Sequence, residues 1–207
     1  MKPDAVKLAP LLIALALLLP GASTAHEAPF AATARLVVAR HGADLLRLAR
    51  QTLVTVVDRG VIDPPIPVPP QDQHPAPMGV FVTLVRNGTV RGCFGSMDPQ
   101  GKTLEALVVE AALGAARFDP RSKPVRQAEL SELQVILSLV GPTVPVLSIA
   151  EVDAKHQGLM VRAGEKRSVL LPGEAKTASW SLRRNLRQAG IRRREHYEMF
   201  RFHTVTL

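Results

Sequence analysis

Apolar residues recur at helical spacing in three segments of the chain. Over residues 35–59 they fall every three or four positions with arginines between them, which predicts an amphipathic helix ending near Gly60. Residues 104–116 are apolar on nearly every side, so we expect a buried helix that starts at Thr103 or a neighbouring residue. A third helix is predicted over residues 177–189, directly before a glycine.

The clearest local signal is a β-hairpin over residues 80–95. Two β-rich runs are joined by Asn87-Gly88, the dipeptide that favours a two-residue hairpin turn. With Arg86 opposite Thr89, the predicted pairs continue as Leu84–Arg91 and Val82–Cys93. Because side chains alternate along a strand, this register predicts two faces. The core face carries Phe81, Val85, Val90 and Phe94, and the other face carries Val82, Leu84, Arg91 and Cys93.

Further alternating runs predict strands over residues 133–139 and 197–206, and a second hairpin over residues 158–171. The strands therefore come mostly as hairpins, with helices between them. This order is typical of an α+β fold, here a largely antiparallel sheet with flanking helices.

The N-terminus has the three-part pattern of a secretory signal peptide. Two lysines precede the apolar run Leu8–Leu19, and small residues lead to a cleavage position after Ala25. The run is shorter than the roughly 20 residues needed to cross a bilayer, although a retained anchor is the alternative. We therefore expect a periplasmic or secreted protein with no stable membrane span once the signal is removed.

The expected organisation is a signal peptide over residues 1–25, an N-terminal segment over residues 26–34 and one domain over residues 35–207. Within that domain, residues 63–77 contain seven prolines in fifteen positions, so we expect a stiff, extended connection.

Composition sets limits on the function. The 207 residues are 46% hydrophobic and 21% charged, as in an ordinary globular protein. A single cysteine excludes an internal disulfide framework and any cysteine-rich metal site.

The basic residues are clustered near the end of the chain. The net charge is +8, and residues 176–201 hold eight basic residues against two acidic ones. Such a cluster binds phosphates, nucleic acid or anionic lipid, or is a solvated helix face. The second reading is favoured, since no aromatic residues interleave to stack bases.

The segment from Arg91 to Gly95 carries the candidate chemistry. Gly92 and Gly95 remove side chains beside the thiol of Cys93, which lets a backbone or a ligand approach closely. A guanidinium from Arg91 on the same face would favour the thiolate, the nucleophilic form. The alternative is that Cys93 is a small hydrophobe packed in a strand, as free cysteines usually are.

Three further residues are candidates for assisting the thiol of Cys93 or for binding its substrate. His156 is the natural general base for Cys93, because a thiol paired with a histidine is the usual activated arrangement. Asp119 and Arg121 either orient a substrate or form an ordinary turn. We find no convincing set of metal ligands and no phosphate-binding, dinucleotide-binding or serine-hydrolase motif, so any cofactor is unknown.

The runs Gly79–Leu84 and Arg91–Gly95 closely resemble the signature of the AMMECR domain family, also called AmmeMemoRadiSam system protein A. The resemblance extends from about residue 36 to the end of the chain. It continues through Ala115-Ala116, Asp119-Pro120-Arg121, Pro124-Val125, Glu129-Leu130, Lys155-His156, Gly158-Leu159, Leu170-Leu171-Pro172, Trp180, Ala189-Gly190 and the strand from Tyr197.

This resemblance implies a compact α+β fold of two unequal lobes with a cleft near the cysteine. It places Arg91, Cys93, Asp119 and His156 near one another, and it implies Memo-type and radical-SAM-type partners in a shared modification pathway. The chain departs from the family pattern where Gly173-Glu174 replaces the usual Gln-Val, and it lacks the second cysteine often found in the last helix.

Two functions remain open at this point. The first is an enzyme that uses Cys93 as a nucleophile on a small metabolite or a nucleotide-like substrate, with Arg91 stabilising the thiolate, His156 as base and Asp119 orienting. The second is a non-catalytic binding module for an anionic ligand or a protein partner, with Gly92, Gly95 and Arg121 lining the site.

Overall fold

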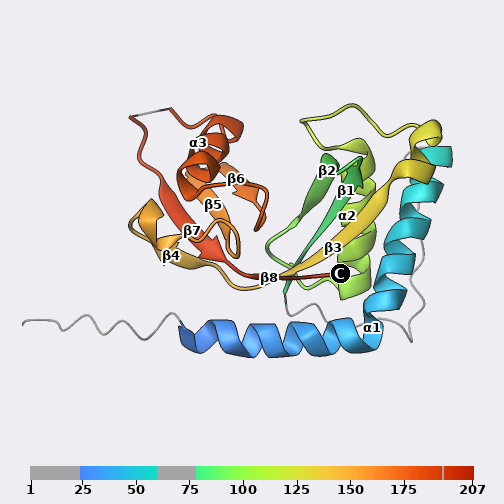
Figure 1. Cartoon of the computed structure of the whole chain (residues 1–207), viewed down its shortest axis with the longest axis horizontal. Helices are drawn as coiled ribbons and strands as arrows, with labels where there is room; N and C mark the ends of the chain where they lie inside the picture. Colours follow the sequence, from blue (N-terminus) through green and yellow to red (C-terminus); the bar gives the residue numbers. More distant parts are fainter. Residues whose placement is uncertain (1–23, 60–77, 193) are drawn as a thin grey trace, which may run out of the picture.

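The computed structural model describes residues 24–59, 78–192 and 194–207, as an α+β fold of two lobes (Figure 1). The expected proline-rich connection, the helix end at Gly60 and nearly all of the expected signal peptide lie outside these residues.

The helices are α1 (Thr24–Arg59), α2 (Leu104–Arg117) and α3 (Ala178–Gln188), with 3-10 turns η2 (Gln127–Glu132) and η3 (Ile149–Glu151). The strands are β1 (Gly79–Arg86), β2 (Thr89–Ser96), β3 (Gln134–Val140), β4 (Val144–Val146), β5 (Gly158–Ala163), β6 (Lys166–Leu170), β7 (Glu198–Phe202) and β8 (Thr204–Thr206).

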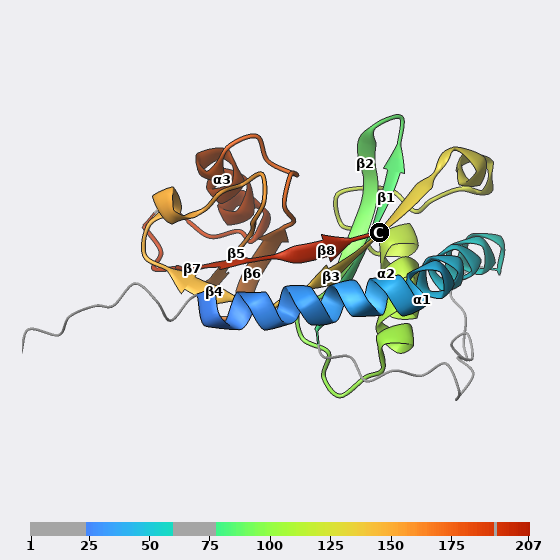
Figure 2. The same ribbon diagram turned by 60° about the horizontal axis from the view of Figure 1, so that its bottom comes forward.

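Each lobe is built on one four-stranded antiparallel sheet. The first sheet has the order β2-β1-β3-β8 and is covered by α1 and α2, while the second has the order β4-β7-β5-β6 and carries α3. Figure 2 shows the two sheets beside each other, with the first part of α1 running below both. The predicted α+β class with antiparallel pairing is therefore confirmed.

Helices α2 and α3 begin within a residue of their predicted starts, and each has a threonine cap. The hydroxyl of Thr103 accepts a hydrogen bond from the backbone N–H of Ala106, and the hydroxyl of Thr177 accepts one from that of Trp180. Helix α2 is buried on nearly all sides between α1 and the first sheet, as its apolar sequence indicates. Helix α1 starts already at Thr24, well before the predicted position 35.

The closing run of the chain forms two strands instead of one. Strand β7 pairs with β4 and β5 in the second sheet, and β8 pairs with β3 in the first. His203 separates them, and its carbonyl accepts a hydrogen bond from the N–H of Gly141. The chain therefore passes straight from one lobe to the other, which ties the two sheets together.

The predicted faces of the first hairpin are wrong. The turn at Asn87-Gly88 and the pair Arg86–Thr89 are as predicted, but a register shift between Leu84 and Val85 leaves Arg91 as an extra residue. Cys93 is consequently opposite Thr83 instead of Val82. The extra residue reverses the alternation of β2 relative to β1, so Cys93 shares a face with Phe81, toward the second lobe, instead of with Val82 and Leu84. Separately, the face of β1 that packs into the core with α1 and α2 is the one with Val82 and Leu84, not the predicted one with Phe81.

The two lobes meet through a small apolar cluster. Phe81 and Val140 come from the first sheet, and Leu171 and Phe202 come from the second lobe. The ring of Phe202 is fully buried and occupies the space that a side chain at Gly158 would need. Cys93, Met97, Met160 and Val169 pack around this cluster, so the thiol lies at the junction of the lobes.

Candidate functional site

A cleft of about 550 Å³ opens at the junction of the lobes, beside this cluster. The first lobe contributes strands β1 and β2 and the loops after β2 and α2. The second lobe contributes β5, β6, the segment after β6 and the end of α3. Its lining is both apolar and charged. It comprises Phe81, Cys93, Phe94, Gly95, Ser96, Met97, Asp98, Gln100, Asp119, Pro120, Arg121, Met160, Arg167, Ser168, Val169, Leu171, Glu174 and Gln188.

The thiol of Cys93 lies in the cleft but is held in its neutral form. Its Sγ atom accepts a hydrogen bond of 3.3 Å from the hydroxyl of Thr83. Burial raises the pKa of the Cys93 thiol to about 11, the nearby carboxylate of Glu174 adds to the rise, and Thr83 and Arg121 oppose it. A neutral thiol is a poor nucleophile, because the thiolate is the reactive form.

Asp119 fixes the loop after α2 against the strand that carries the thiol. One carboxylate oxygen, Oδ2, accepts the backbone N–H of Cys93 at 2.8 Å, and the other accepts the backbone N–H of Arg121 at 2.9 Å. The Arg121 side chain also donates from Nε and Nη2 to this carboxylate. Burial alone would raise the pKa of Asp119, but the hydrogen bonds from Arg121 and Cys93 outweigh it and lower the pKa.

Asp119 therefore holds Arg121 in one orientation at the cleft. The turn that the sequence predicts at Asp119 is present, and it also presents a guanidinium to the cavity. Asp119 is nearly fully buried, whereas the Arg121 side chain keeps about 29% of its surface exposed. A guanidinium oriented in this way is suited to binding a carboxylate or a phosphate.

Glu174 was not among the sequence-predicted site residues, yet its carboxylate lines the cleft from the second lobe. Its Oε2 atom accepts the backbone N–H of Leu171 at 3.0 Å. Burial raises the pKa of Glu174, while the hydrogen bond from Leu171 and the charges of Arg121 and Arg184 oppose the rise. The only sequence signal was the departure at Gly173-Glu174 from the family pattern.

Arg91 does not lie beside the thiol, contrary to the predicted shared face. Its guanidinium donates to the buried carboxylate of Glu129 at 2.8 Å and 3.0 Å, and to the carbonyls of Lys123 and Pro124. The hydrogen bond from Arg91 is the largest cause that lowers the pKa of Glu129, to about 2. The register shift at Arg91 explains the error. The guanidinium that acts on Cys93 is that of Arg121.

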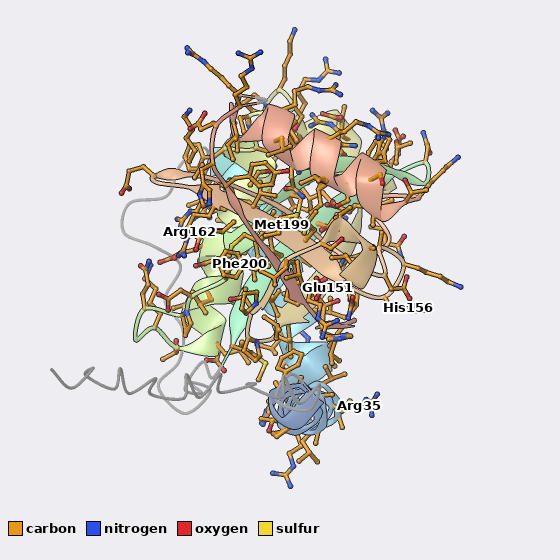
Figure 3. All side chains as sticks on the ribbon, turned by 90° about the vertical axis from the view of Figure 1, so that its left-hand side faces the viewer. Arg35, Glu151, His156, Arg162, Met199 and Phe200 are labelled. Carbon is orange, nitrogen blue, oxygen red and sulfur yellow. The ribbon has the colours of Figure 1, made fainter. Side chains whose placement is uncertain are left out.

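His156 is also away from the thiol. It lies in the turn before β5 and bonds through Nδ1 to the carboxylate of Asp153 at 2.6 Å. Its side chain is about 64% exposed, at the outer edge of the second lobe in Figure 3. No histidine is among the described residues that line the cleft, so the predicted use of His156 as a base for Cys93 finds no support in the geometry. The proximity of His156 to Cys93 that the family resemblance implied is not present either.

The two glycines beside the thiol have different surroundings. A side chain at Gly92 would meet the backbone carbonyl of Ala115 in α2 at 2.3 Å, so this glycine allows the helix to pack closely on β2. Gly95 lines the cleft and also lies tightly against β1, where a side chain would meet the carbonyl of Val80. Of the predicted ligand-contacting residues, Gly95 and Arg121 therefore reach the cavity and Gly92 does not.

Two further properties hold for the described part of the chain. No group of three or more histidine, cysteine, aspartate or glutamate side chains is arranged to hold a metal ion there. None of its helices is both long and apolar enough to cross a bilayer.

Proteins with similar sequences include one from Thermotoga maritima and one from Methanothermobacter thermautotrophicus. A Thermotoga maritima protein is 37% identical over 113 residues, which cover 54% of this chain and 64% of the relative. A Methanothermobacter thermautotrophicus protein is 38% identical over 108 residues, covering 49% of this chain. The matched region spans only 56% of that second relative, so in both cases less than two thirds of the relative's length is matched.

The fold also matches a solved structure. The crystal structure of an uncharacterized protein from Pyrococcus horikoshii is similar with a TM-score of 0.63 and 27% sequence identity, covering 78% of this chain and 88% of that one. The family model AMMECR1 matches residues 46–207, which include both sheets and every residue that lines the cleft. The resemblance of the Gly79–Leu84 and Arg91–Gly95 runs is thereby confirmed, and the chain belongs to the AMMECR1 family.

Proposed function

We propose that this AMMECR1-family chain is an exported binding module whose cleft holds a small ligand with an apolar body and an anionic group. The observation that carries the proposal is the guanidinium of Arg121, which Asp119 fixes at the edge of a cavity of about 550 Å³. That volume is in the range of small-molecule sites, about 300–1,000 Å³. Phe81, Met160 and Val169 supply apolar surface for the body of the ligand.

The enzyme hypothesis has less support. The thiol that it needs as a nucleophile has a raised pKa, and its two proposed helpers, Arg91 and His156, are bound to the carboxylates of Glu129 and Asp153. One observation still favours it, since Cys93 does line the cleft. A measurement of Cys93 reactivity, described in the Discussion, separates the two functions.

Binding is tested with a matched pair of fluorescent probes. The probe 8-anilinonaphthalene-1-sulfonate has an aromatic body and a sulfonate, and N-phenyl-1-naphthylamine has the same body without charge. We expect the sulfonate to bind saturably at one site and more tightly than the neutral probe, by about tenfold or 1.4 kcal/mol. Equal affinity for both probes would show that the cleft does not recognise an anion.

The position of the bound probe is tested with two tryptophan variants. Ser168 lines the cleft, so Ser168→Trp fills part of the cavity and is expected to weaken binding of the sulfonate at least about tenfold. Ser179 is exposed on α3 and is not among the cleft residues, so Ser179→Trp is the matched control and leaves affinity unchanged. Equal affinities of both variants and the wild type would contradict the proposed site.

The proposals of export and of protein partners do not depend on the cleft. The signal pattern over residues 1–25 supports export, and a fusion of these residues to alkaline phosphatase without its own signal tests it, because that enzyme needs periplasmic disulfides to become active. An inactive fusion would contradict export. Association with Memo-type or radical-SAM-type proteins stays a prediction from the family resemblance.

A further inference from the structure

Glu174 brings a second charged group into the cleft, from the lobe opposite Arg121. Its Oε2 atom is occupied by the backbone N–H of Leu171. Among the described residues, no hydrogen-bond donor reaches its Oε1 atom. One carboxylate oxygen is therefore fixed by the fold, and the other is available to a donor that enters the cavity.

Arg121 has the complementary arrangement. Its Nε and Nη2 atoms are bound to Asp119, and within the described part of the chain Nη1 has no hydrogen-bond partner. The carboxylate of Asp119 is occupied by donors from Arg121 and Cys93, so it is not available to a ligand cation. An anionic group that enters the cleft therefore meets Arg121, whereas a cationic group meets Glu174.

The charges that line the cleft are nearly balanced. Asp98, Asp119 and Glu174 are the carboxylates, and Arg121 and Arg167 are the guanidiniums. Arg184, which is outside the lining, also acts electrostatically on Glu174. A ligand with a single negative charge would satisfy only the guanidiniums and would leave the partly buried Glu174 unpaired, which is costly. A ligand with both charges satisfies both sides.

We propose that the cleft binds a zwitterion with apolar side chains, namely a short peptide, whose ammonium group contacts Glu174 and whose carboxylate contacts Arg121. This inference rests on the proposed binding function and specifies its ligand. Met160, Val169 and Leu171 offer an apolar surface for the side chains. The amide oxygen of Gln188 accepts from the hydroxyl of Ser168, and its N–H groups offer hydrogen bonds for a peptide carbonyl. The volume of the cavity accommodates a drug-sized ligand, so a peptide of a few residues fills it better than one amino acid.

Isothermal titration calorimetry with three related dipeptides tests this ligand class. The probes are L-leucyl-L-phenylalanine, its N-acetyl derivative, which lacks the ammonium, and its C-terminal amide, which lacks the carboxylate. We expect the free dipeptide to bind, and each blocked form to bind at least about tenfold more weakly. Binding of the N-acetyl form as tight as that of the free dipeptide would overturn the role of Glu174. No binding of any of the three would overturn the ligand class.

A charge-neutral variant assigns the ammonium preference to one residue. In Glu174→Gln the carboxylate is replaced by an amide of the same volume. The ratio of the dissociation constants of the N-acetyl form and the free dipeptide is then expected to fall close to one. Glu165→Gln is the matched control, because Glu165 is exposed in the turn between β5 and β6, outside the cleft, and it keeps the full preference. An unchanged preference in Glu174→Gln would overturn the assignment.

The naphthalene probes distinguish the two possible failures. If 8-anilinonaphthalene-1-sulfonate binds in the cleft but the dipeptides do not, the binding function stands and the peptide inference fails. If neither the sulfonate nor any dipeptide binds, both fail.

Discussion

The backbone N–H of Cys93 donates a hydrogen bond of 2.8 Å to Oδ2 of Asp119, across 26 residues of sequence. This bond joins the central strand residue of the family signature to the loop that follows α2. The same carboxylate orients Arg121, so one buried aspartate connects the thiol-bearing strand and the guanidinium of the cleft.

Replacement of this aspartate by asparagine is expected to destabilise the protein. Asp119→Asn removes the charge that pairs with Arg121 and weakens several hydrogen bonds of a buried group, a loss of about 2–4 kcal/mol in the free energy of unfolding. Urea unfolding at pH 7 measures it. Asp153→Asn, which removes the exposed partner of His156, is the control and leaves stability unchanged. Equal stability of the two variants would contradict a structural role for Asp119.

The same variant has a defined pH dependence. The pKa of Asp119 is lowered in the folded protein, so its stabilising contribution is complete above the pKa of the unfolded chain and is lost as the pH falls through the lower folded pKa. The difference between the wild type and Asp119→Asn is therefore expected to shrink below about pH 4. A difference that stays constant from pH 7 to pH 3 would show that the charge of Asp119 is not involved.

Cys93 is expected to react slowly with iodoacetamide in the folded protein. With a pKa of about 11, its thiolate fraction at pH 8 is roughly 200-fold lower than that of an ordinary cysteine with a pKa near 8.5. The alkylation rate of the folded chain is compared with that of the chain unfolded in guanidinium chloride, where the thiol has ordinary surroundings. A folded rate at pH 8 that equals or exceeds the unfolded rate would contradict the binding-module proposal and favour the enzyme.

Much of the fold follows from local sequence patterns, whereas the site depends on details that these patterns do not encode. The Asn87-Gly88 turn, the cap at Thr103 and the antiparallel α+β class are all visible in the sequence. The register shift at Arg91 is not visible, because a β-bulge depends on how β2 packs against its neighbours. That single extra residue moved Cys93 to the other face and separated it from Arg91.

The contacts between the two lobes could not be predicted from the sequence, for a different reason. Residues 197–206 alternate continuously, and nothing in that pattern shows that the chain leaves one sheet at His203 and enters the other. The crossing joins the second sheet to the first, and the cleft lies where the two lobes meet. Arg121 and Glu174 therefore come to line the same cleft only once both lobes are in place.

Gly92 is expected to be a packing residue and not a ligand contact. Gly92→Ala would place its new methyl group 2.3 Å from the carbonyl oxygen of Ala115, and both strands and helix α2 are too well packed to move freely. We expect a loss of about 2–3 kcal/mol in the free energy of unfolding, measured by urea denaturation. Val90→Ala, at an exposed position of the same strand, is the control with a loss below about 1 kcal/mol. A fully stable Gly92→Ala that loses ligand affinity would contradict the packing role.

Glu174 is expected to reduce the stability of the ligand-free protein, because its carboxylate is partly buried and has no ion-pair partner among the described residues until a ligand binds. Burial is the largest cause that raises the pKa of Glu174, and it is opposed by the hydrogen bond from Leu171 and by the charges of Arg121 and Arg184, while Asp119 adds to the rise. The folded protein therefore holds a proton on Glu174 at a pH where the unfolded chain has released it. The stability of the wild type falls as the pH rises from the unfolded pKa through the folded one.

Glu174→Gln lacks this titration, so it is expected to match the wild type most closely below about pH 4 and to become the more stable protein as the pH rises to 8. Thermal unfolding of both proteins across this range measures the difference. Glu165→Gln, at an exposed turn, is expected to show no such trend. If Glu174→Gln were instead less stable than the wild type at pH 8, Arg121 and Arg184 would already satisfy the carboxylate in the empty protein. The cleft would then hold no unsatisfied carboxylate for a ligand ammonium group, and the preference for the free dipeptide would need another source.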